Sequence, residues 1–438
     1  MRMKWTVGFM LLAIFAAGTV GAQALQEPLT LEESIKIALE KNLSLHSAQE
    51  GVVGSRYRQK QAMTNFLPQW TGDYSYSWND PAVTVGLIQA ALPTQRLTSH
   101  DLFNFNTVIN QPIFAGGSIL SNYRLEKYGV EISKGDVETV KRDIVLQVRV
   151  GYFNILTAEK LVDVAKQAVK QFEAQLEVSK AFFEVGIIPK NDLLQAEVRL
   201  ANARQALVNA ENNLALTKSS FNILLRRDIN ESLSVVDILV YKPSVLRLEE
   251  SIDEALRQRP ELKNAGLRVE QARESVKIAR SGFFPGISLT GYYGRYSNDL
   301  SLYGDLNSQR WTLEALASFN LFDWGKTAYK VGESKVKVTQ AEDSKLALID
   351  GIILEVKQDY LNMITAEKNV NVAEKSIEQA EENLRMNEER YKYQVATATD
   401  VLDAVVLLAQ ARVNYYGALS DFNVARARLD RAMGRMCP

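Results

Sequence analysis

The chain carries two copies of one unit, and this duplication limits the folds that it can adopt. Four stretches of the first half recur in the second half in the same order. They are Leu31–Ile35 and Leu248–Ile252, Phe66–Pro68 and Phe283–Pro285, Tyr152–Lys160 and Tyr360–Lys368, and Phe182–Arg204 and Tyr391–Arg412. The offset is 217 residues for the first pair (248 − 31) and 208 for the third (360 − 152). Chance similarity does not keep its order over so many matches, so we expect a repeated unit of about 210 residues.

Each unit ends in a pattern typical of an antiparallel helical hairpin. After a short polar turn, apolar residues fall seven apart: Leu193, Leu200, Leu207, Leu214 and Phe221 in the first copy, and Val401, Leu408, Tyr415, Phe422 and Leu429 in the second. Such a sustained repeat is the seam of a coiled coil. We expect the returning helices to begin at Asn191-Asp192 and Thr399-Asp400, because such side chains accept bonds from the first free backbone N–H groups.

The segments before these turns are predicted to be unusually long helices. Residues 118–185 and 326–393 contain no proline and few glycines. At about 1.5 Å per residue, each helix would be roughly 100 Å long, which is several times the length of a normal globular helix. The opening helices, near 30–65 and 249–282, should end at the prolines that follow them, because proline cannot continue a helix. Helices of this length are suited to crossing a distance rather than to enclosing a catalytic pocket.

Apolar and polar residues alternate in two segments of each unit, between the opening and the long helices. The apolar positions are Trp70, Tyr74, Tyr76 and Trp78, then Phe103, Phe105 and Ile109, then Ile287, Leu289 and Tyr293, then Trp311, Leu313, Ala315, Ala317 and Phe319. This pattern predicts strands that are wet on one face and apolar on the other. They could form soluble hairpins packed on helices, or transmembrane barrel strands of about 10 residues. Four such strands in an exported chain otherwise made of amphipathic helices favour the barrel.

The first residues have the layout of a secretory signal. Basic residues precede a mostly apolar run from Trp5 to Ala17, and Ala22-Gln-Ala24 follows it. We expect residues 1–24 to be a signal peptide, cleaved after Ala24 or after Ala22. The alternative is a transmembrane anchor, which the shortness of the run disfavours. No later stretch approaches about 18 uninterrupted apolar residues, so an exported chain that spans a membrane would do so with strands.

The remaining boundaries follow from the repeat. We expect the first repeat at 25–225, a linker or equatorial segment at 226–247, the second repeat at 248–434 and a short tail at 435–438. Pro243 and β-branched residues place the linker outside the long helices.

The composition fits a folded protein and excludes several classes of function. Of the 438 residues, 46% are apolar, and the net charge of −1 argues against a nucleic-acid partner, which calls for a basic excess. The single cysteine, Cys437, excludes internal disulfides and thiol metal clusters. The two histidines, His46 and His100, are isolated in the sequence, and Gly116-Gly117 lacks the lysine and spacing of a phosphate-binding loop. Because no nucleophile and base can be paired, we expect neither an enzyme nor a cofactor.

Together these features resemble the TolC-like outer membrane efflux protein family. The resemblance rests on the two turn motifs, the Phe-x-Pro junctions and the Ala-x-Ala-Arg sequences that end at Arg204 and Arg412, and it spans residues from about 28 to 434. It implies a mainly α fold with a membrane β part. Three chains would form one twelve-stranded β-barrel in the outer membrane and an α-barrel in the periplasm, closed at the coiled-coil tips. The residues alone show only that four strands cannot close a barrel, so that at least two copies are needed.

Four residues match positions that the family uses at the closed end of the tunnel. Asp400 and Asp403 match an acidic ring at the periplasmic aperture, which would favour cations and repel anions. Asp400 is also placed to cap the following helix, and the two roles can coexist. Asp192 and Tyr391 match a gate latch in which an acid accepts a phenol hydrogen bond. The alternatives are a helix cap for Asp192 and a seam aromatic for Tyr391.

Two residues depart from the family pattern near the second turn. Ala396 stands where an arginine is expected, and Gln394 where a glycine is usual. The resemblance therefore does not extend to the salt bridge of the latch, and we expect the closed state to be held more weakly. The resemblance also implies that a periplasmic adaptor docks on the hairpin tips, whose residues include Gly186, Pro189, Asn191, Ala396 and Thr399.

We therefore expect a passive exit duct of a tripartite efflux system, located in the outer membrane with a large periplasmic part. Its implied partners are two further copies of the chain, outer membrane lipid, a periplasmic adaptor and an inner-membrane transporter. A close alternative is the exit duct of a type I protein secretion system, which uses the same family. An alternative of another class is a non-membrane periplasmic coiled-coil adaptor or scaffold, against which the four strands and the duplication argue.

Overall fold

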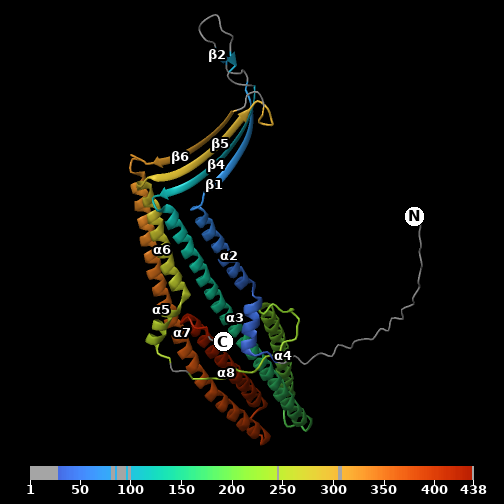
Figure 1. The fold of residues 1–438 in the computed structure, drawn as a ribbon. Coiled ribbons are helices and arrows are strands. Elements are labelled where there is room, and N and C mark those ends of the chain that lie inside the picture. Colours follow the sequence, from blue (N-terminus) through green and yellow to red (C-terminus); the bar gives the residue numbers. More distant parts are fainter. Residues whose placement is uncertain are drawn as a thin grey trace, which may run out of the picture.

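The computed structural model describes residues 28–79, 84–85, 95–96, 100–243, 246–303 and 308–436. The predicted signal peptide and Cys437 lie outside these residues. The described chain is long and bent, with a curved sheet at one end and two helical hairpin tips at the other (Figure 1).

Eight α-helices and six strands make up this part of the chain. The helices are α1 (Leu31–Lys41), α2 (Leu43–Thr64), α3 (Ser118–Glu184), α4 (Lys190–Leu224), α5 (Leu248–Gln258), α6 (Pro260–Arg280), α7 (Lys326–Lys392) and α8 (Ala398–Ala432). The strands are β1 (Gln69–Trp78), β2 (Thr84–Val85), β3 (Gln95–Arg96), β4 (Asp101–Ala115), β5 (Gly286–Ser297) and β6 (Ser308–Ser318). The two halves repeat the same order of helices, strands and hairpin, apart from the small β2–β3 pair of the first half.

The two long helices are confirmed at 67 residues each. Both begin directly after a glycine in the left-handed region, Gly117 at φ 83° and Gly325 at φ 81°, which lets the strand turn sharply into the helix. At about 1.5 Å per residue each spans about 100 Å. They run from the sheet to the tips, and α4 and α8 return along only the half remote from the sheet (Figure 1).

The prediction of one continuous opening helix per repeat was wrong. Each opening segment is two helices, separated at Asn42 in the first repeat and at Arg259 in the second. Asn42 is extended at ψ 126°, and its side-chain oxygen accepts bonds from the backbone N–H groups of Ser44 and Leu45, so it ends α1 and caps α2. Arg259 precedes Pro260, which has no N–H to donate and suits the first position of a new helix.

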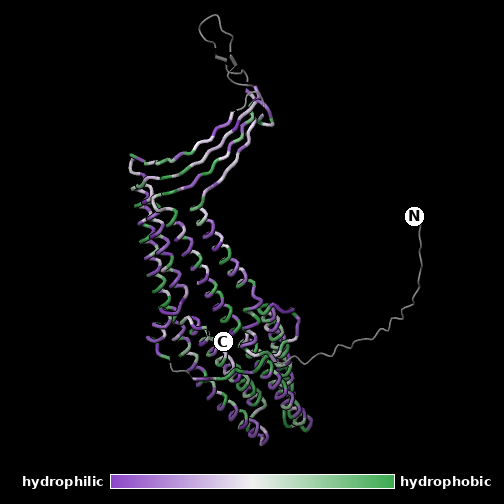
Figure 2. Tube along the Cα trace, in the orientation of Figure 1, coloured by the Kyte–Doolittle hydropathy of each residue, from purple (hydrophilic) through white to green (hydrophobic). Residues whose placement is uncertain are grey.

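The four long strands form one antiparallel sheet in the order β1-β4-β5-β6. Its register places the alternating apolar residues together, because Trp70 pairs with Ile109, and Leu289 pairs with Ala315. The polar positions likewise face one side, as where Thr290 pairs with Glu314. Figure 2 shows this alternation of hydrophobic and hydrophilic colour along the strands. The sheet therefore has one apolar and one polar face, as the period of two predicts.

The helices lie side by side in two tiers. Near the sheet the order is α2-α3-α6-α7, and near the tips it is α4-α3-α8-α7. The heptad seam of α8 is buried at Val401, Leu408, Phe422 and Leu429, because α8 lies between α3 and α7. On α4 only Leu200 and Phe221 of the seam are buried, because α4 forms the edge of its tier.

Two equivalent tyrosines fasten the segment between the repeats to the long helices. The hydroxyl of Tyr152 on α3 lies 2.7 Å from the carbonyl oxygen of Val236 and 3.0 Å from that of Leu29. Burial raises the pKa of Tyr152 to about 12. Tyr360 on α7 donates to the carbonyl oxygen of Leu246 at 3.3 Å. Equivalent tyrosines of the two repeats therefore hold the segment that links the repeats against the middle of the long helices.

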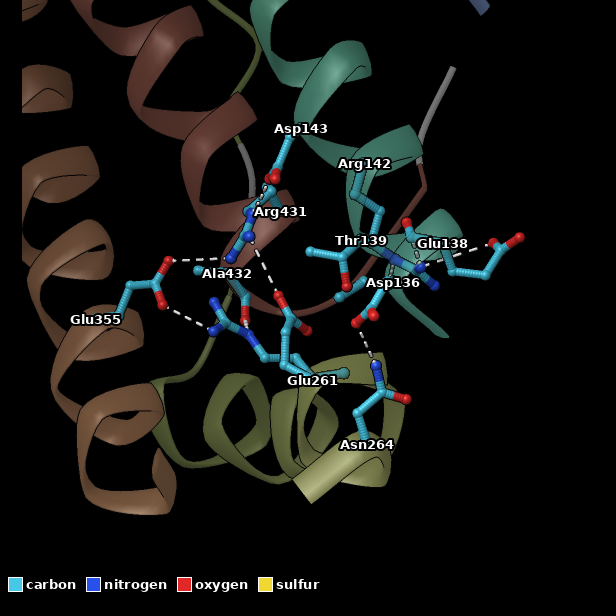
Figure 3. Close-up of polar contacts among 12 residues, drawn as sticks. Asp136, Glu138, Thr139, Arg142, Asp143, Glu261, Asn264, Glu355, Arg431 and Ala432 are labelled. Carbon is cyan, nitrogen blue, oxygen red and sulfur yellow. Dashed lines mark hydrogen bonds and ion pairs between the residues drawn. The ribbon is translucent and has the colours of Figure 1, made fainter. Parts of the chain in front are cut away.

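A polar cluster at the end of α8 joins four helices (Figure 3). Arg431 lies between three carboxylates, Asp143 of α3 at 2.9 Å, Glu261 of α6 at 3.1 Å and Glu355 of α7 at 3.4 Å. Arg259, whose side chain is 3% exposed, bonds Glu355 and the carbonyl oxygen of Ala432. The cluster lies where the two tiers meet and fixes the end of α8 to helices of both.

Gly135 lets α6 approach α3 closely, which gives a test of the packing between the tiers. A Cβ there would lie 2.1 Å from Oδ1 of the buried Asn264, whose amide donates to the Ile132 carbonyl and to Asp136. We expect Gly135→Ala to be less stable than Gly51→Ala by about 1–3 kcal/mol. Both changes bring the same gain in helix propensity, and a Cβ at Gly51 meets nothing within 4 Å. Thermal unfolding followed by far-UV circular dichroism measures the difference, and equal midpoints would contradict the close approach.

Candidate functional site

The two hairpin turns have the same backbone geometry. In the first, Gly186 is left-handed at φ 75°, and the N–H of Ile187 donates to the Phe182 carbonyl. In the second, Gln394 is left-handed at φ 60°, and the N–H of Val395 donates to the Arg390 carbonyl. This is the usual way to close a helix with a left-handed residue. Gln394 does so with a Cβ, which costs about 1–2 kcal/mol relative to glycine.

The predicted starting residues of the returning helices are displaced by two to three positions. The capping residue of α8 is Thr397, and that of α4 is Pro189. Asp400 completes a capping box: its carboxylate accepts from the backbone N–H and the hydroxyl of Thr397, both at 2.8 Å. These bonds, with the charge of Arg390, lower the pKa of Asp400. The capping role expected as one alternative for Asp400 is therefore present.

Asp192 occupies the equivalent third position of α4 but makes no capping hydrogen bond. The reason is Pro189, which has neither a hydroxyl group nor a backbone N–H to form a capping box. The helix-cap alternative for Asp192 is wrong, and its carboxylate remains available to another partner.

Tyr391 is buried at the tip, with 4% of its surface exposed. Its ring packs on Phe182 of the other hairpin, with centroids 5.3 Å apart. Burial raises the pKa of Tyr391. The nearby Ser179 hydroxyl lowers this pKa, and the negative charge of Asp192 raises it further. Among the described residues the Tyr391 hydroxyl has no hydrogen-bond partner. Asp192 and Tyr391 are thus brought into electrostatic range without the direct bond of the expected latch.

Asp403 has a partner that the sequence did not predict. Its carboxylate accepts from Nη2 of Arg199 on α4 at 2.8 Å, and both side chains are about half exposed. One turn nearer the tip, the hydroxyl of Thr399 donates to Oε1 of Gln195 at 3.0 Å. Gln195 and Arg199 were missed because a contact between α4 and α8 depends on how the two hairpins pack. The sequence did contain one signal of this contact: Gln195 and Arg199 are four residues apart on α4, and Thr399 and Asp403 are four residues apart on α8.

The tip residues expected to meet a partner lie at the surface. Gly186, Pro189, Asn191 and Thr399 are exposed, and Ala396 is half-buried. Across the described part of the chain, no group of histidine, cysteine, aspartate and glutamate side chains is arranged to hold a metal ion. None of the described helices is long and apolar enough to cross a membrane.

Comparison with known proteins places the chain in a family. The model of the outer membrane efflux protein family matches residues 34–220 and 251–435, one match for each repeat. The chain belongs to the outer membrane efflux protein family, and it is an outer membrane protein whose large helical part lies in the periplasm.

Two curated relatives are also outer membrane proteins. The outer membrane protein TolC of Vibrio cholerae is 23% identical over 350 residues, which cover 77% of each chain. The outer membrane efflux protein BepC of Brucella suis is 22% identical over 431 residues, 97% of this chain and 89% of BepC.

Solved structures share the fold over almost the whole chain. The CmeC outer membrane channel of Campylobacter jejuni has a TM-score of 0.79 at 21% identity, covering 92% of this chain and 85% of CmeC. The outer membrane protein VceC of Vibrio cholerae has a TM-score of 0.78 at 16% identity, covering 92% and 96%. The expected fold class is confirmed.

Proposed function

We propose that the chain is the passive exit duct of a tripartite efflux system and works as a homotrimer. The observation that carries the proposal is a four-stranded sheet with two unpaired edges, joined directly to the long helices. In the described chain, β1 pairs only with β4, and β6 pairs only with β5. Open edges in lipid leave backbone groups unbonded, at a cost of several kcal/mol each, so copies of the sheet must join edge to edge.

The tier of helices near the tips, like the sheet, ends on both sides in an element with no further neighbour in the described chain. These outermost helices are α4 and α7. Apolar side chains of α4 stand exposed along its outer side, including Leu194, Val198, Val208 and Leu216. The other edge helix, α7, exposes Leu346, Leu354, Leu361 and Val372. An apolar stripe of this length on a folded chain is typical of an interface. Edge-to-edge contact of further copies would cover both stripes while it closes the barrel, and the likeness to the family supports a number of three.

Isolation in mild detergent tests the proposal. We expect a stable trimer by light scattering and ion-conducting channels after insertion into planar bilayers. A monomer, or a trimer that conducts no ions, would refute the exit duct. Membership of an outer membrane family argues against the expected alternative of a non-membrane scaffold. Pull-down with the exposed hairpin tips would identify the adaptor, and its identity would separate efflux from type I protein secretion.

The proposed aperture ring gives a separate prediction. Asp400 and Asp403 both lie in the first two turns of α8, at the tip of the second hairpin. We expect Asp400→Ala with Asp403→Ala to lower the cation-over-anion permeability ratio and the block by divalent cations, because six carboxylates are lost from the trimer. Asp421→Ala, on an exposed position far along α8, is the control. Unchanged selectivity would mean that these residues act only in capping and surface pairing.

A further inference from the structure

The contact between α4 and α8 joins the two hairpins through two stacked interactions. Arg199 bonds Asp403, and Thr399 bonds Gln195. The residues are four apart on each helix, so the interactions lie one helical turn apart on facing sides. Because α4 and α8 belong to different repeats, separation of the hairpins must break both.

We propose that Arg199 determines the ion selectivity of the aperture by neutralising Asp403 while the hairpins lie together and releasing it when they separate. The inference rests on the proposed function, because these side chains influence ions only if they face a conducting path. At 2.8 Å the guanidinium and carboxylate nearly cancel each other's field beyond a few ångströms. Once they are separated by more than a Debye length of about 8–10 Å, the carboxylate acts on ions by itself.

Two arginines of the returning helices near the tip, Arg204 and Arg412, are held differently. Arg204 pairs with Glu173 at 2.8 Å, and Arg412 pairs with Glu381 at 2.9 Å. Each of these pairs lies within one hairpin, between its outgoing and its returning helix. They survive a separation of the hairpins, whereas the pair of Arg199 and Asp403 does not. Arg412 also hydrogen-bonds Gln167 of α3 across the hairpins, but this contact changes no net charge.

Asp400 and Asp403 therefore contribute in two different ways. The carboxylate of Asp400 is fixed in the capping box of α8, so it keeps its negative charge whether or not the hairpins move. The charge of Asp403 is compensated only while Arg199 is beside it. We infer that the aperture is weakly cation-selective when closed and becomes strongly cation-selective as it opens.

The test compares Arg199→Gln with the unaltered protein in planar bilayers. Glutamine keeps the polarity and most of the length of arginine but not its charge. We expect the cation-over-anion permeability ratio of the low-conductance state to rise toward that of the high-conductance state, which should itself stay unchanged. The fraction of time spent open should rise by about two- to fivefold per protomer, the range for loss of an exposed ion pair. The charge exchange Arg199→Asp with Asp403→Arg should restore the closed state.

The control is Arg204→Gln, which removes a positive charge from the same helix; its side chain is 61% exposed, against 43% for Arg199. Detergent-stable trimer yield shows that each variant assembles, and the charge exchange keeps the test informative if Arg199→Gln assembles poorly. Equal selectivity of Arg199→Gln and the unaltered protein in both states would overturn the inference and leave the exit duct standing. An effect of Arg204→Gln as large as that of Arg199→Gln would also overturn it. If the unaltered trimer conducts no ions, the proposed function and this inference fall together.

Discussion

Replacing Ala315 with arginine is expected to abolish assembly of the trimeric barrel. Ala315 lies in the middle of β6, on the apolar face with Leu313 and Ala317, and pairs with Leu289 of β5. An arginine on the lipid face at the bilayer midplane costs about 2–4 kcal/mol, and three copies in one barrel would cost about 6–12 kcal/mol. We expect the detergent-stable trimer to be lost from the outer membrane fraction, as measured by light scattering and heat-resistant migration in gels.

The matched control is Thr312→Arg, three residues away on the same strand. Thr312 lies on the polar face, where it pairs with Tyr292 and neighbours Glu314. An arginine there would point into the water-filled interior, where substitutions alter selectivity more than stability. Loss of the trimer in both variants would indicate general damage to the strand, and loss in Thr312→Arg alone would show that the two faces have been assigned the wrong way round. Normal yield of both variants would show that neither face of β6 meets lipid.

The elements that the sequence predicted are those determined by local chemistry. The absence of proline over 118–185 predicts a continuous α3, and the alternation around Ala315 predicts a strand with one apolar face. The breaks at Asn42 and Arg259 are also local, and both were missed. Asn42 was treated as a residue inside a helix although its side chain is a strong capping group, and Pro260 was overlooked as a first helical residue.

The candidate site could be predicted only in part, because its contacts join distant parts of the chain. Asp400 bonds Thr397, which is three residues away, so the capping box can be recognised from the sequence. Asp403 bonds Arg199, 204 residues earlier (403 − 199), and this depends on how α4 and α8 are packed beside each other. The heptad pattern fixes the packing within a hairpin but not the register between two hairpins. Arg199 therefore could not be recognised before the fold was known.

Arg431 shows the same dependence on the fold, and its removal should have the largest effect on the stability of the helical part. Each of its three acidic partners comes from a different helix, and Glu261 is 23% exposed. Without Arg431 these acids face one another, and within the described part of the chain only Glu355 keeps a cation, Arg259. We expect Arg431→Met to lower the free energy of unfolding by about 2–4 kcal/mol, below the range for a fully buried pair because Asp143 and Glu355 are partly exposed.

Thermal unfolding in detergent, at low and at molar salt, measures this effect. Salt screens the repulsion among the remaining acids, so the loss should be smaller at high salt. Arg247→Met is the control, because Arg247 pairs with Glu250 on the surface at 3.4 Å with both side chains largely exposed, and such pairs contribute about 0–1 kcal/mol. If the two variants unfold at the same temperature, the cluster at the end of α8 is a surface arrangement of charges. A loss confined to Arg431→Met would show that Arg431 fixes the end of α8 to helices of both tiers.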